Sequence, residues 1–165
     1  MDRWIFAPSA FFPSAARPFS DDDNSGDGQW AYSDARSLIM DPDAEANATF
    51  GLVAKYKKGV TEPQGNTEFR CEAGDFRFKS SSYEWLVIAG TKAMFKGQGS
   101  IDGMGEGFKF MLTAVDDDNS GDRFRIKIWD ETTEPELVIY DNKRGEDDDA
   151  EPTIVGGGSI VIHKN

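Results

Sequence analysis

Hydrophobic and polar residues alternate along most of the chain from Ala48 onward. In the first such run, Phe50, Leu52 and Ala54 fall on one side of an extended backbone, and mainly polar residues fall on the other. Because the side chains of a strand point alternately to its two faces, this period is typical of a strand with one buried face. We therefore expect a sheet whose strands turn their apolar faces toward a common core.

The alternating runs are short and regularly spaced. They recur about every ten residues, which is the spacing of an antiparallel β-sandwich or barrel. No segment keeps the period of about 3.6 residues that a long amphipathic helix needs. The sequence therefore predicts an all-β fold of about eight or nine short strands. The expected strands cover residues 48–57, 67–71, 76–78, 83–89, 93–96, 108–114, 124–129, 137–140 and 159–163.

Two of these strands carry a more detailed expectation. In the apolar run that begins at Tyr83, strict alternation puts Tyr83 and Trp85 on the same face. The strand over residues 93–96 is expected to end at Gly97, because glycine weakens a strand interior.

The first 20 residues differ from the rest of the chain. Residues 1–20 are apolar and rich in proline, with no helix or strand period, and we interpret them as an N-terminal arm. Pro8 and Pro13 interrupt this segment, so it lacks the continuous apolar run of a signal peptide or a membrane span. The arm either packs on its own domain, which we favour, or docks on a neighbouring molecule. Residues 21–165 are expected to form a single β-domain.

Composition restricts the partners of such a domain. The formal net charge is −12, from 30 acidic and 18 basic residues. Nucleic acid and anionic membrane surfaces are therefore not expected as partners, because binding phosphate groups needs a basic surface. The charge fits divalent cations, cationic partners or a salty medium, and it also fits plain solubility. The single cysteine, Cys71, alternates with Phe69, so we expect a buried apolar residue and no internal disulfide.

One acidic heptamer occurs twice in the chain. The sequence Asp-Asp-Asp-Asn-Ser-Gly-Asp stands at residues 21–27 and again at residues 116–122. Oxygen-bearing side chains at the first, third and fifth places of a loop, with glycine at the sixth, follow the spacing of calcium-binding loops. We therefore predict a Ca²⁺ site in at least one heptamer. The predicted ligands are Asp21, Asp23, Ser25 and Asp27 in the first loop and Asp116, Asp118, Ser120 and Asp122 in the second.

The match to an EF-hand loop is incomplete. At the place of the bidentate glutamate of an EF-hand, the two loops have Tyr32 and Lys127. Water, backbone carbonyl groups or a carboxylate from elsewhere would have to complete the site. The alternative is that Asp, Asn, Ser and Gly are present only because they form turns well. The carboxylates that could complete the site are Asp102, Asp130, Glu131 and those of residues 146–149.

Motifs for catalysis are weak in this sequence. The only histidine is His163, and no Gly-x-Ser-x-Gly motif accompanies it. Paired carboxylates can hydrolyse glycosides, but the acidic residues here cluster in loops, which suits metal binding better. We therefore expect no enzymatic activity.

Aromatic residues indicate a second class of function. Trp30 and Tyr32 directly follow the first acidic loop and are the candidate ligand-binding residues, because exposed aromatic rings can stack on sugars. Trp85 and Trp129 fit a place in the core better. A structural calcium beside an aromatic platform is the pattern of a carbohydrate-binding module, which is the alternative function.

Several runs between residues 48 and 163 match a known family. They are residues 50–59, 63–69, 80–87, 95–99, 124–129, 140–142 and 156–163. In these runs the chain resembles the post-COAP-1 domain, a β-rich C-terminal module of large bacterial secreted and surface proteins. The resemblance implies an extracellular or cell-surface location, since such modules often follow adhesive β-repeats, and it implies no particular activity.

These observations lead to one functional hypothesis. We expect a non-enzymatic, calcium-stabilised extracellular β-module that works in adhesion, assembly or surface structure. Its partner would be another copy of the chain, a neighbouring surface protein or a glycan. In one variant of the hypothesis, residues 1–20 join copies of the chain into an oligomer or filament.

Overall fold

A computed structural model describes residues 4–14, 31–32, 38–39, 46–56, 61–71, 75–155 and 160–163. These residues contain twelve strands and no α-helix, which confirms the all-β prediction. The strands are β1 (Trp4–Ser14), β2 (Ala31–Tyr32), β3 (Leu38–Ile39), β4 (Ala46–Lys55), β5 (Gln64–Cys71), β6 (Phe76–Ala89), β7 (Lys92–Ile101), β8 (Gly105–Val115), β9 (Arg123–Asp130), β10 (Leu137–Asp141), β11 (Thr153–Ile154) and β12 (Val161–His163).

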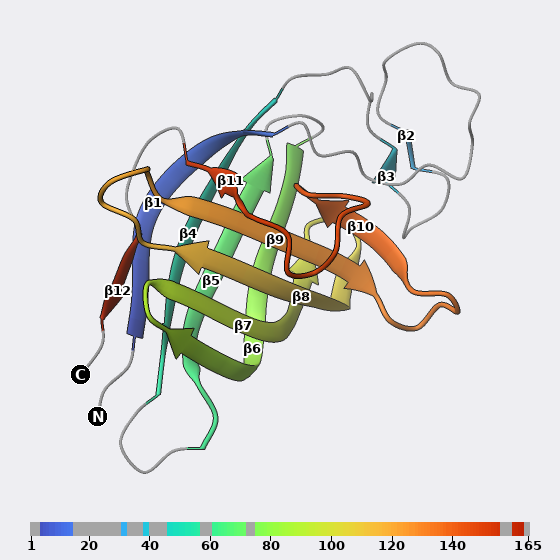
Figure 1. Cartoon of the computed structure of the whole chain (residues 1–165). Coiled ribbons are helices and arrows are strands. Elements are labelled where there is room, and N and C mark those ends of the chain that lie inside the picture. The colour runs from blue at the N-terminus through green and yellow to red at the C-terminus, as the bar shows by residue number, and fades with distance from the viewer. Residues whose placement is uncertain are drawn as a thin grey trace.

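Ten of the described strands form one antiparallel sheet. Its order is β10-β9-β8-β7-β6-β5-β4-β1-β12, with β11 also paired to β9, and β2 pairs with β3 in a separate small sheet. From β4 to β10 each strand pairs with the next one along the chain, so this part is a simple meander. At its far side β1 and β12 bring the two ends of the chain together (Figure 1).

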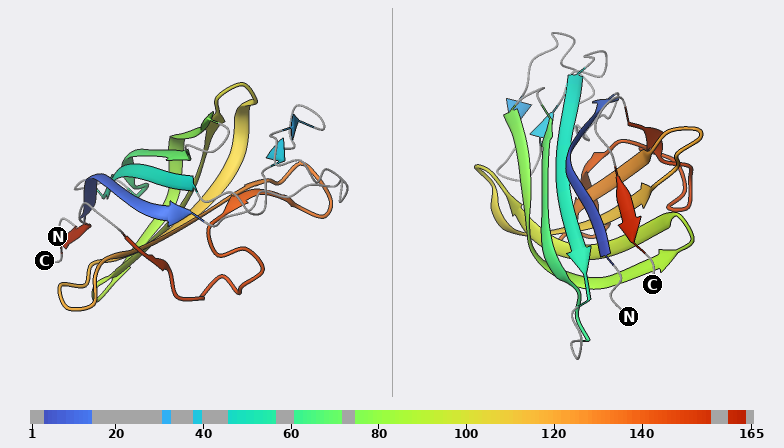
Figure 2. Two further views of the ribbon diagram at one scale, coloured as in Figure 1. Left: turned by 90° about the horizontal axis from the view of Figure 1, so that it is seen from above. Right: turned by 90° about the vertical axis from the view of Figure 1, so that its left-hand side faces the viewer.

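The sheet curls so that its two halves face each other. Figure 1 shows β8 and β9 crossing in front of β4 and β5, and Figure 2 shows the curl from two further sides. Phe50 on β4 stacks on Phe124 on β9, with ring centroids 3.6 Å apart. Phe69 on β5 lies 4.6 Å from Tyr140 on β10, measured between the same points. The core is thus built between two halves of one sheet, much as a sandwich builds it between two sheets.

Aromatic side chains fill this core, as their abundance suggests. Phe95 and Phe110 are fully buried and meet edge to face, with ring planes 85° apart. Such pairs add about 0.5–1.5 kcal/mol beyond the burial of their surface. Cys71 is also fully buried, as predicted.

The long strand β6 bends where the sheet turns from one half to the other. Its pairing with β7 shifts register between Ser80 and Ser82 and again between Tyr83 and Trp85. A register shift of this kind bends a strand and changes which residues face the core. Tyr83 is accordingly buried while Trp85 is only half-buried, so the expectation that they share one face is wrong.

Strand β7 continues through Gly97 and Gly99 instead of ending at the first glycine, as we had expected. A Cβ atom on Gly97 would lie 2.2 Å from the carbonyl oxygen of Ser82, and one on Gly99 would lie 2.2 Å from that of Lys79. No side chain fits at such distances. The glycines therefore let β7 approach the irregular part of β6 closely, which is a recognised use of glycine inside a strand.

Residues 4–14 of the N-terminal segment form strand β1, which corrects the interpretation of this part as an arm without strand structure. β1 pairs with β4 on one side and with β12 on the other. Two possibilities were considered for this segment, packing on its own domain or docking on a neighbouring molecule. In this structure it packs on its own domain. Its register against β4 shifts between Ala7 and Ala10, around Pro8, where a proline can be accommodated in a sheet. This strand could not be predicted from the hydrophobic pattern, because its apolar residues do not alternate with polar ones.

Candidate functional site

The second acidic heptamer forms the connection between β8 and β9, and Asp117 organises it. Asp117 Oδ1 accepts hydrogen bonds from the backbone N–H groups of Asn119 and Ser120, at 2.9 and 3.1 Å, and its other carboxylate oxygen accepts one from the Ser120 hydroxyl. The chain then turns at Gly121, whose φ of 92° favours glycine. The residue at the second place of the heptamer thus builds the turn, although sequence reasoning did not include it among the site residues.

The loop also sets the charge state of this carboxylate. Hydrogen bonds from the side chain and backbone of Ser120 and from the backbone of Asn119 lower the pKa of Asp117 to about 2. The positive charge of Arg123 acts in the same direction. Hydrogen bonds to the charged form of a carboxylic acid favour that form, so Asp117 stays ionised well into the acidic range.

The first and last residues of the heptamer reach a distant part of the chain. Asp116 Oδ2 accepts a hydrogen bond of 2.9 Å from the N–H of Ile162, and Asp122 Oδ2 accepts one of 2.5 Å from the N–H of Ile160. Asp122 also accepts the N–H of Asp117 through Oδ1 and that of Val155 through its backbone carbonyl. We call these contacts of Asp116 with Ile162 in β12, and of Asp122 with Ile160 directly before β12, the C-terminal clasp.

The structure places only the second set of predicted calcium ligands. Asp116, Asp118, Ser120 and Asp122 all lie in the β8–β9 connection, but Asp116, Ser120 and Asp122 already take part in protein hydrogen bonds. Among the described residues, no three or more His, Cys, Asp or Glu side chains are arranged to hold a metal ion. The first heptamer, Asp21, Asp23, Ser25 and Asp27, lies outside the described residues, as does Trp30. Tyr32 is in β2, whose side chains are not described.

The other carboxylates considered for the calcium site are engaged elsewhere. Asp130 Oδ1 accepts hydrogen bonds from the N–H and the hydroxyl of Thr132, at 2.9 and 2.6 Å. Glu131 lies 3.8 Å from the ammonium group of Lys109. Asp102 lies at a groove described below. None of these three contacts involves the second heptamer.

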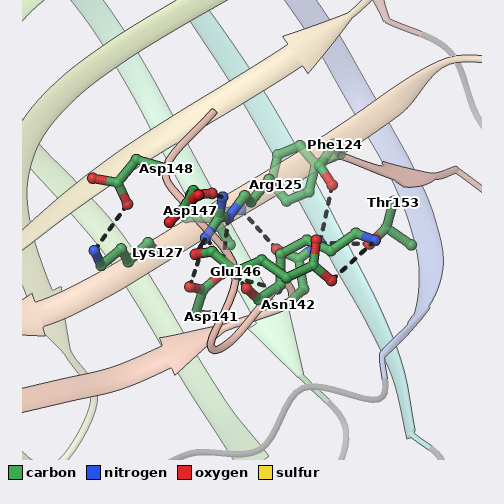
Figure 3. A network of polar contacts seen from close by, with 11 residues as sticks. Phe124, Arg125, Lys127, Asp141, Asn142, Glu146, Asp147, Asp148 and Thr153 are labelled. Carbon is green, nitrogen blue, oxygen red and sulfur yellow. Dashed lines mark hydrogen bonds and ion pairs between the residues drawn. The ribbon is translucent and has the colours of Figure 1, made fainter. Parts of the chain in front are cut away.

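The third acidic cluster, residues 146–149, is held by a buried arginine (Figure 3). Arg125 on β9 and Asp141 at the end of β10 are 2% and 3% exposed. The guanidinium group donates two hydrogen bonds to the carboxylate, from Nε at 3.1 Å and from Nη2 at 3.0 Å. It also donates to the backbone carbonyl groups of Asp147 at 2.6 Å and of Lys143 and Glu146 at 3.3 Å. This set of contacts fixes the acidic loop on the outer face of β9.

Neighbouring polar groups complete the attachment of this loop. Burial alone would lower the pKa of Arg125, but hydrogen bonds and charge from Asp141, with charge from Asp148 and Glu146, raise it. Asn142 exchanges hydrogen bonds with the backbone of β9, donating to Phe124 at 2.9 Å and accepting from Ile126 at 2.8 Å. The cluster therefore has a structural explanation in the fold.

A groove of about 420 Å³ crosses the outer face of β4, β5 and β6. Phe50, Phe69 and Phe78 point to the core there, so the residues beside them point outward. Pairing between the three strands arranges the outward residues in two rows. One row is Thr49–Arg70–Arg77 and the other is Gly51–Glu68–Lys79. Gly51 lacks a side chain, which leaves its row open at one end.

The walls of the groove carry charges of both signs. Arg70 and Arg77 are about half exposed, with exposed side-chain fractions of 53% and 48%. Asp75 lies between them, with its carboxylate 3.6 Å from Arg70 and 3.5 Å from Arg77. In the other row Lys79 lies 3.7 Å from Glu68. Sequence reasoning missed this groove, because its residues are far apart in the chain and only strand register brings them together.

Trp129 lies on the outer face of β9 and is 6% exposed. The ammonium groups of Lys96 and Lys127 lie 5.5 and 5.7 Å from its ring centre, so the lysine side chains cover the ring. Its Nε1 has no hydrogen-bond partner within the described part of the chain. A covered ring does not offer a sugar a stacking surface. Trp129 is buried, but beneath lysine side chains on the outer face of β9 and not in the core cluster that was expected for it.

Among the described residues, no helix has the length and apolar character needed to cross a membrane.

Comparisons with known proteins do not assign the chain to a family. No family model matches the chain, and neither a curated protein nor a solved structure matches it. The resemblance to the post-COAP-1 domain therefore stays a prediction.

Proposed function

We propose that this chain is a non-enzymatic extracellular β-module that works in adhesion, assembly or surface structure. The observation that carries the proposal is the C-terminal clasp. β12 is three residues long and pairs with β1 through three residue pairs, so its ladder alone would hold it weakly. The two carboxylates of the clasp give this strand a second attachment. A fold that fastens a short strand at the side of its sheet in this way suits a module joined to others or placed under load.

Calcium is the ion we propose for the second heptamer. Asp116, Asp117, Asp118 and Asp122 bring four carboxylates into one short loop, and a bound cation would relieve their mutual repulsion. Ca²⁺ prefers carboxylate and hydroxyl oxygens, which this loop offers. Because a carboxylate has about four lone-pair sites, Asp116 and Asp122 can keep their N–H partners while they coordinate an ion. Calcium would then strengthen the clasp.

Calorimetric titration of chelator-treated protein with CaCl₂, together with its melting curve, tests this proposal. Binding of the ion should raise the melting temperature, since a ligand at 100 times its dissociation constant adds about 2.7 kcal/mol to stability. Asp118→Asn removes one predicted ligand outside the clasp and should weaken binding. Glu106→Gln makes the same charge change at an exposed residue outside all the carboxylates considered for the site and serves as the control. No heat and an unchanged melting temperature would contradict a calcium site in either heptamer.

Assembly through the N-terminal segment receives less support than the clasp. β1 pairs with β4 along one edge, and β12 covers its other edge over Trp4, Ile5 and Phe6, so those three residues are closed to a strand from another copy. Joining copies through this part of β1 would require β12 to leave it. Light scattering at high protein concentration with calcium tests this variant, and a monomer would contradict it.

A carbohydrate-binding module is the second candidate function. The groove over β4, β5 and β6 favours it, since small-ligand sites usually enclose about 300–1,000 Å³ and combine apolar surface with a few polar groups. The sugar-binding residues expected from sequence, Trp30 and Tyr32, have no described side chains, so the support comes from a different part of the chain. Retention on a glycan array tests this function.

A further inference from the structure

We propose that the groove over β4, β5 and β6 binds sugars that carry a carboxylate, with Arg70 and Arg77 as the groups that recognise it. This inference rests on the second candidate function and names the class of sugar. It places the ligand site on the opposite side of β4–β6 from the core.

The arginine row supplies the donors. Arg70 and Arg77 are directly opposite each other on β5 and β6, so their guanidinium groups emerge side by side. Their contacts with Asp75, at 3.6 and 3.5 Å, are ion pairs longer than the usual hydrogen bond of about 2.7–3.2 Å. One carboxylate therefore faces two cations, which leaves positive charge in this row. A guanidinium group has five N–H donors in a planar fork that matches a carboxylate.

Asp75 holds the two guanidinium groups close to each other. Its φ of 54° is in the left-handed region, which aspartate visits more readily than most residues. Asp75 directly precedes β6, and its carboxylate contacts both arginines. Asp75 thus draws the two guanidinium groups together without covering either one, since both remain about half exposed.

The remaining walls suit hydroxyl groups. Thr49 can donate and accept, while Glu68 and Asp102 can accept. A sugar acid offers one carboxylate and several hydroxyl groups that each donate and accept, so it matches a wall with guanidinium groups on one side and carboxylates on the other. A compact dianion such as phosphate would be repelled by Glu68 and Asp102. The mixed charge therefore favours a sugar acid over a simple anion.

The test uses an oligogalacturonate and its methyl ester, which is the same chain without its charges. Titration calorimetry should show the charged form binding at least about tenfold more tightly, which corresponds to about 1.4 kcal/mol. Arg70→Gln and Arg77→Gln should remove this preference. Lys55→Gln is the matched control, because Lys55 is an exposed cation on the outer face of β4 that does not line the groove. Melting curves should be equal for the three variants.

A second variant separates shape from charge. Gly51→Val should fill the open end of its row without changing any charge, and it should weaken binding of both oligosaccharides. Equal binding of the two oligosaccharides would overturn the preference for a carboxylate and leave the carbohydrate-binding function standing. Binding of neither would overturn both. Inorganic phosphate binding as tightly as the oligogalacturonate would mark a plain anion site and would also overturn the inference.

Discussion

The carboxylate of Asp116 accepts a hydrogen bond of 2.9 Å from the backbone N–H of Ile162, 46 residues further along the chain. Asp122 does the same for Ile160 at 2.5 Å. Because successive N–H groups of a strand point to opposite edges, the N–H of Ile162 lies on the edge of β12 that faces away from β1, and Ile160 directly precedes the strand. Two side chains thus take the place of the carbonyl groups that a neighbouring strand would offer, and the last strand is held without a further ladder.

Removing a carboxylate of the clasp should destabilise the fold. In Asp122→Ala the N–H of Ile160, a residue that is 2% exposed, loses its acceptor. An unsatisfied buried donor costs about 1–3 kcal/mol, so we expect a loss of this size in urea unfolding with chelator present. Amide exchange at Ile160 and Ile162 should quicken at the same time.

Asp118→Ala is the control for the clasp. It removes an equal charge from the same loop without touching β12, and a surface change of this kind should stay within about 0.5 kcal/mol. An equal loss in both variants would assign the effect to loop charge and would contradict the clasp.

The turn built by Asp117 should contribute stability that disappears in acid. Its folded pKa of about 2 lies below the ordinary value of 3.8, so the folded state binds the proton less tightly than the unfolded state. The contribution is therefore complete above about pH 4 and is lost as the pH falls toward about 2. Asp117→Asn, which cannot ionise, should be less stable than the natural protein at neutral pH. Melting curves from neutral to acidic pH should show the two proteins converge, and a constant difference would contradict this role.

Local alternation was enough to predict most strands of the sheet, but it missed β1 and did not predict every face. Phe50, Leu52 and Ala54 follow strict alternation and are all buried, as expected. Tyr83 and Trp85 are separated by a register shift, which depends on how β6 meets β7 and leaves no mark in the sequence around them. The same bent contact explains Gly97, whose position under the backbone of Ser82 is a tertiary property.

The candidate sites, too, could be predicted only in part from the sequence. The repeated heptamer predicted a metal-binding loop, and its second copy forms the hydrogen-bonded connection between β8 and β9. Its contact from Asp116 to Ile162 spans 46 residues, so no local pattern could predict it. The groove has no motif at all, since Arg70 and Arg77 meet only because β5 and β6 pair in one register. A signal was present in Arg77 and Lys79, which stand on alternate places of β6, but alternation within one strand does not say which residues of a neighbouring strand lie beside them.

The buried ion pair of Arg125 and Asp141 should contribute far more to the free energy of unfolding than the exposed pair of Lys127 and Asp148. Arg125→Met leaves a carboxylate that is 3% exposed without its main partner, and losses of about 3–5 kcal/mol are usual for a broken buried pair. Lys127→Met is a matched control, because Lys127 is two residues along the same strand and pairs with Asp148 of the same loop at 3.0 Å. That pair is more exposed, so its loss should cost at most about 1 kcal/mol. Similar unfolding free energies for the two variants would contradict the structural role of Arg125.

Tyr83 should make the fold sensitive to alkali. Its hydroxyl donates to the carbonyl of Val53 at 3.0 Å and lies 2.6 Å from the hydroxyl of Thr67. Burial raises the pKa of Tyr83 from 10.0 to about 12, despite hydrogen bonds from Thr67 and Ser80 that act in the opposite direction. The folded state therefore holds this proton more tightly than the unfolded state, and the stability that follows is complete below the unfolded pKa. It should be lost as the pH rises from about 10 to about 12.

Tyr83→Phe isolates this effect. The variant should be less stable at neutral pH, because it leaves Val53 and Thr67 with unsatisfied polar groups, and a smaller part of its stability should be lost in alkali. Tyr56→Phe is the control, since Tyr56 also hydrogen-bonds a backbone carbonyl, that of Leu86 at 3.1 Å, and the variant keeps Tyr83. Urea unfolding at increasing pH measures both. If Tyr83→Phe lost as much stability between neutral and alkaline pH as the natural protein, another group would have to carry the alkaline transition.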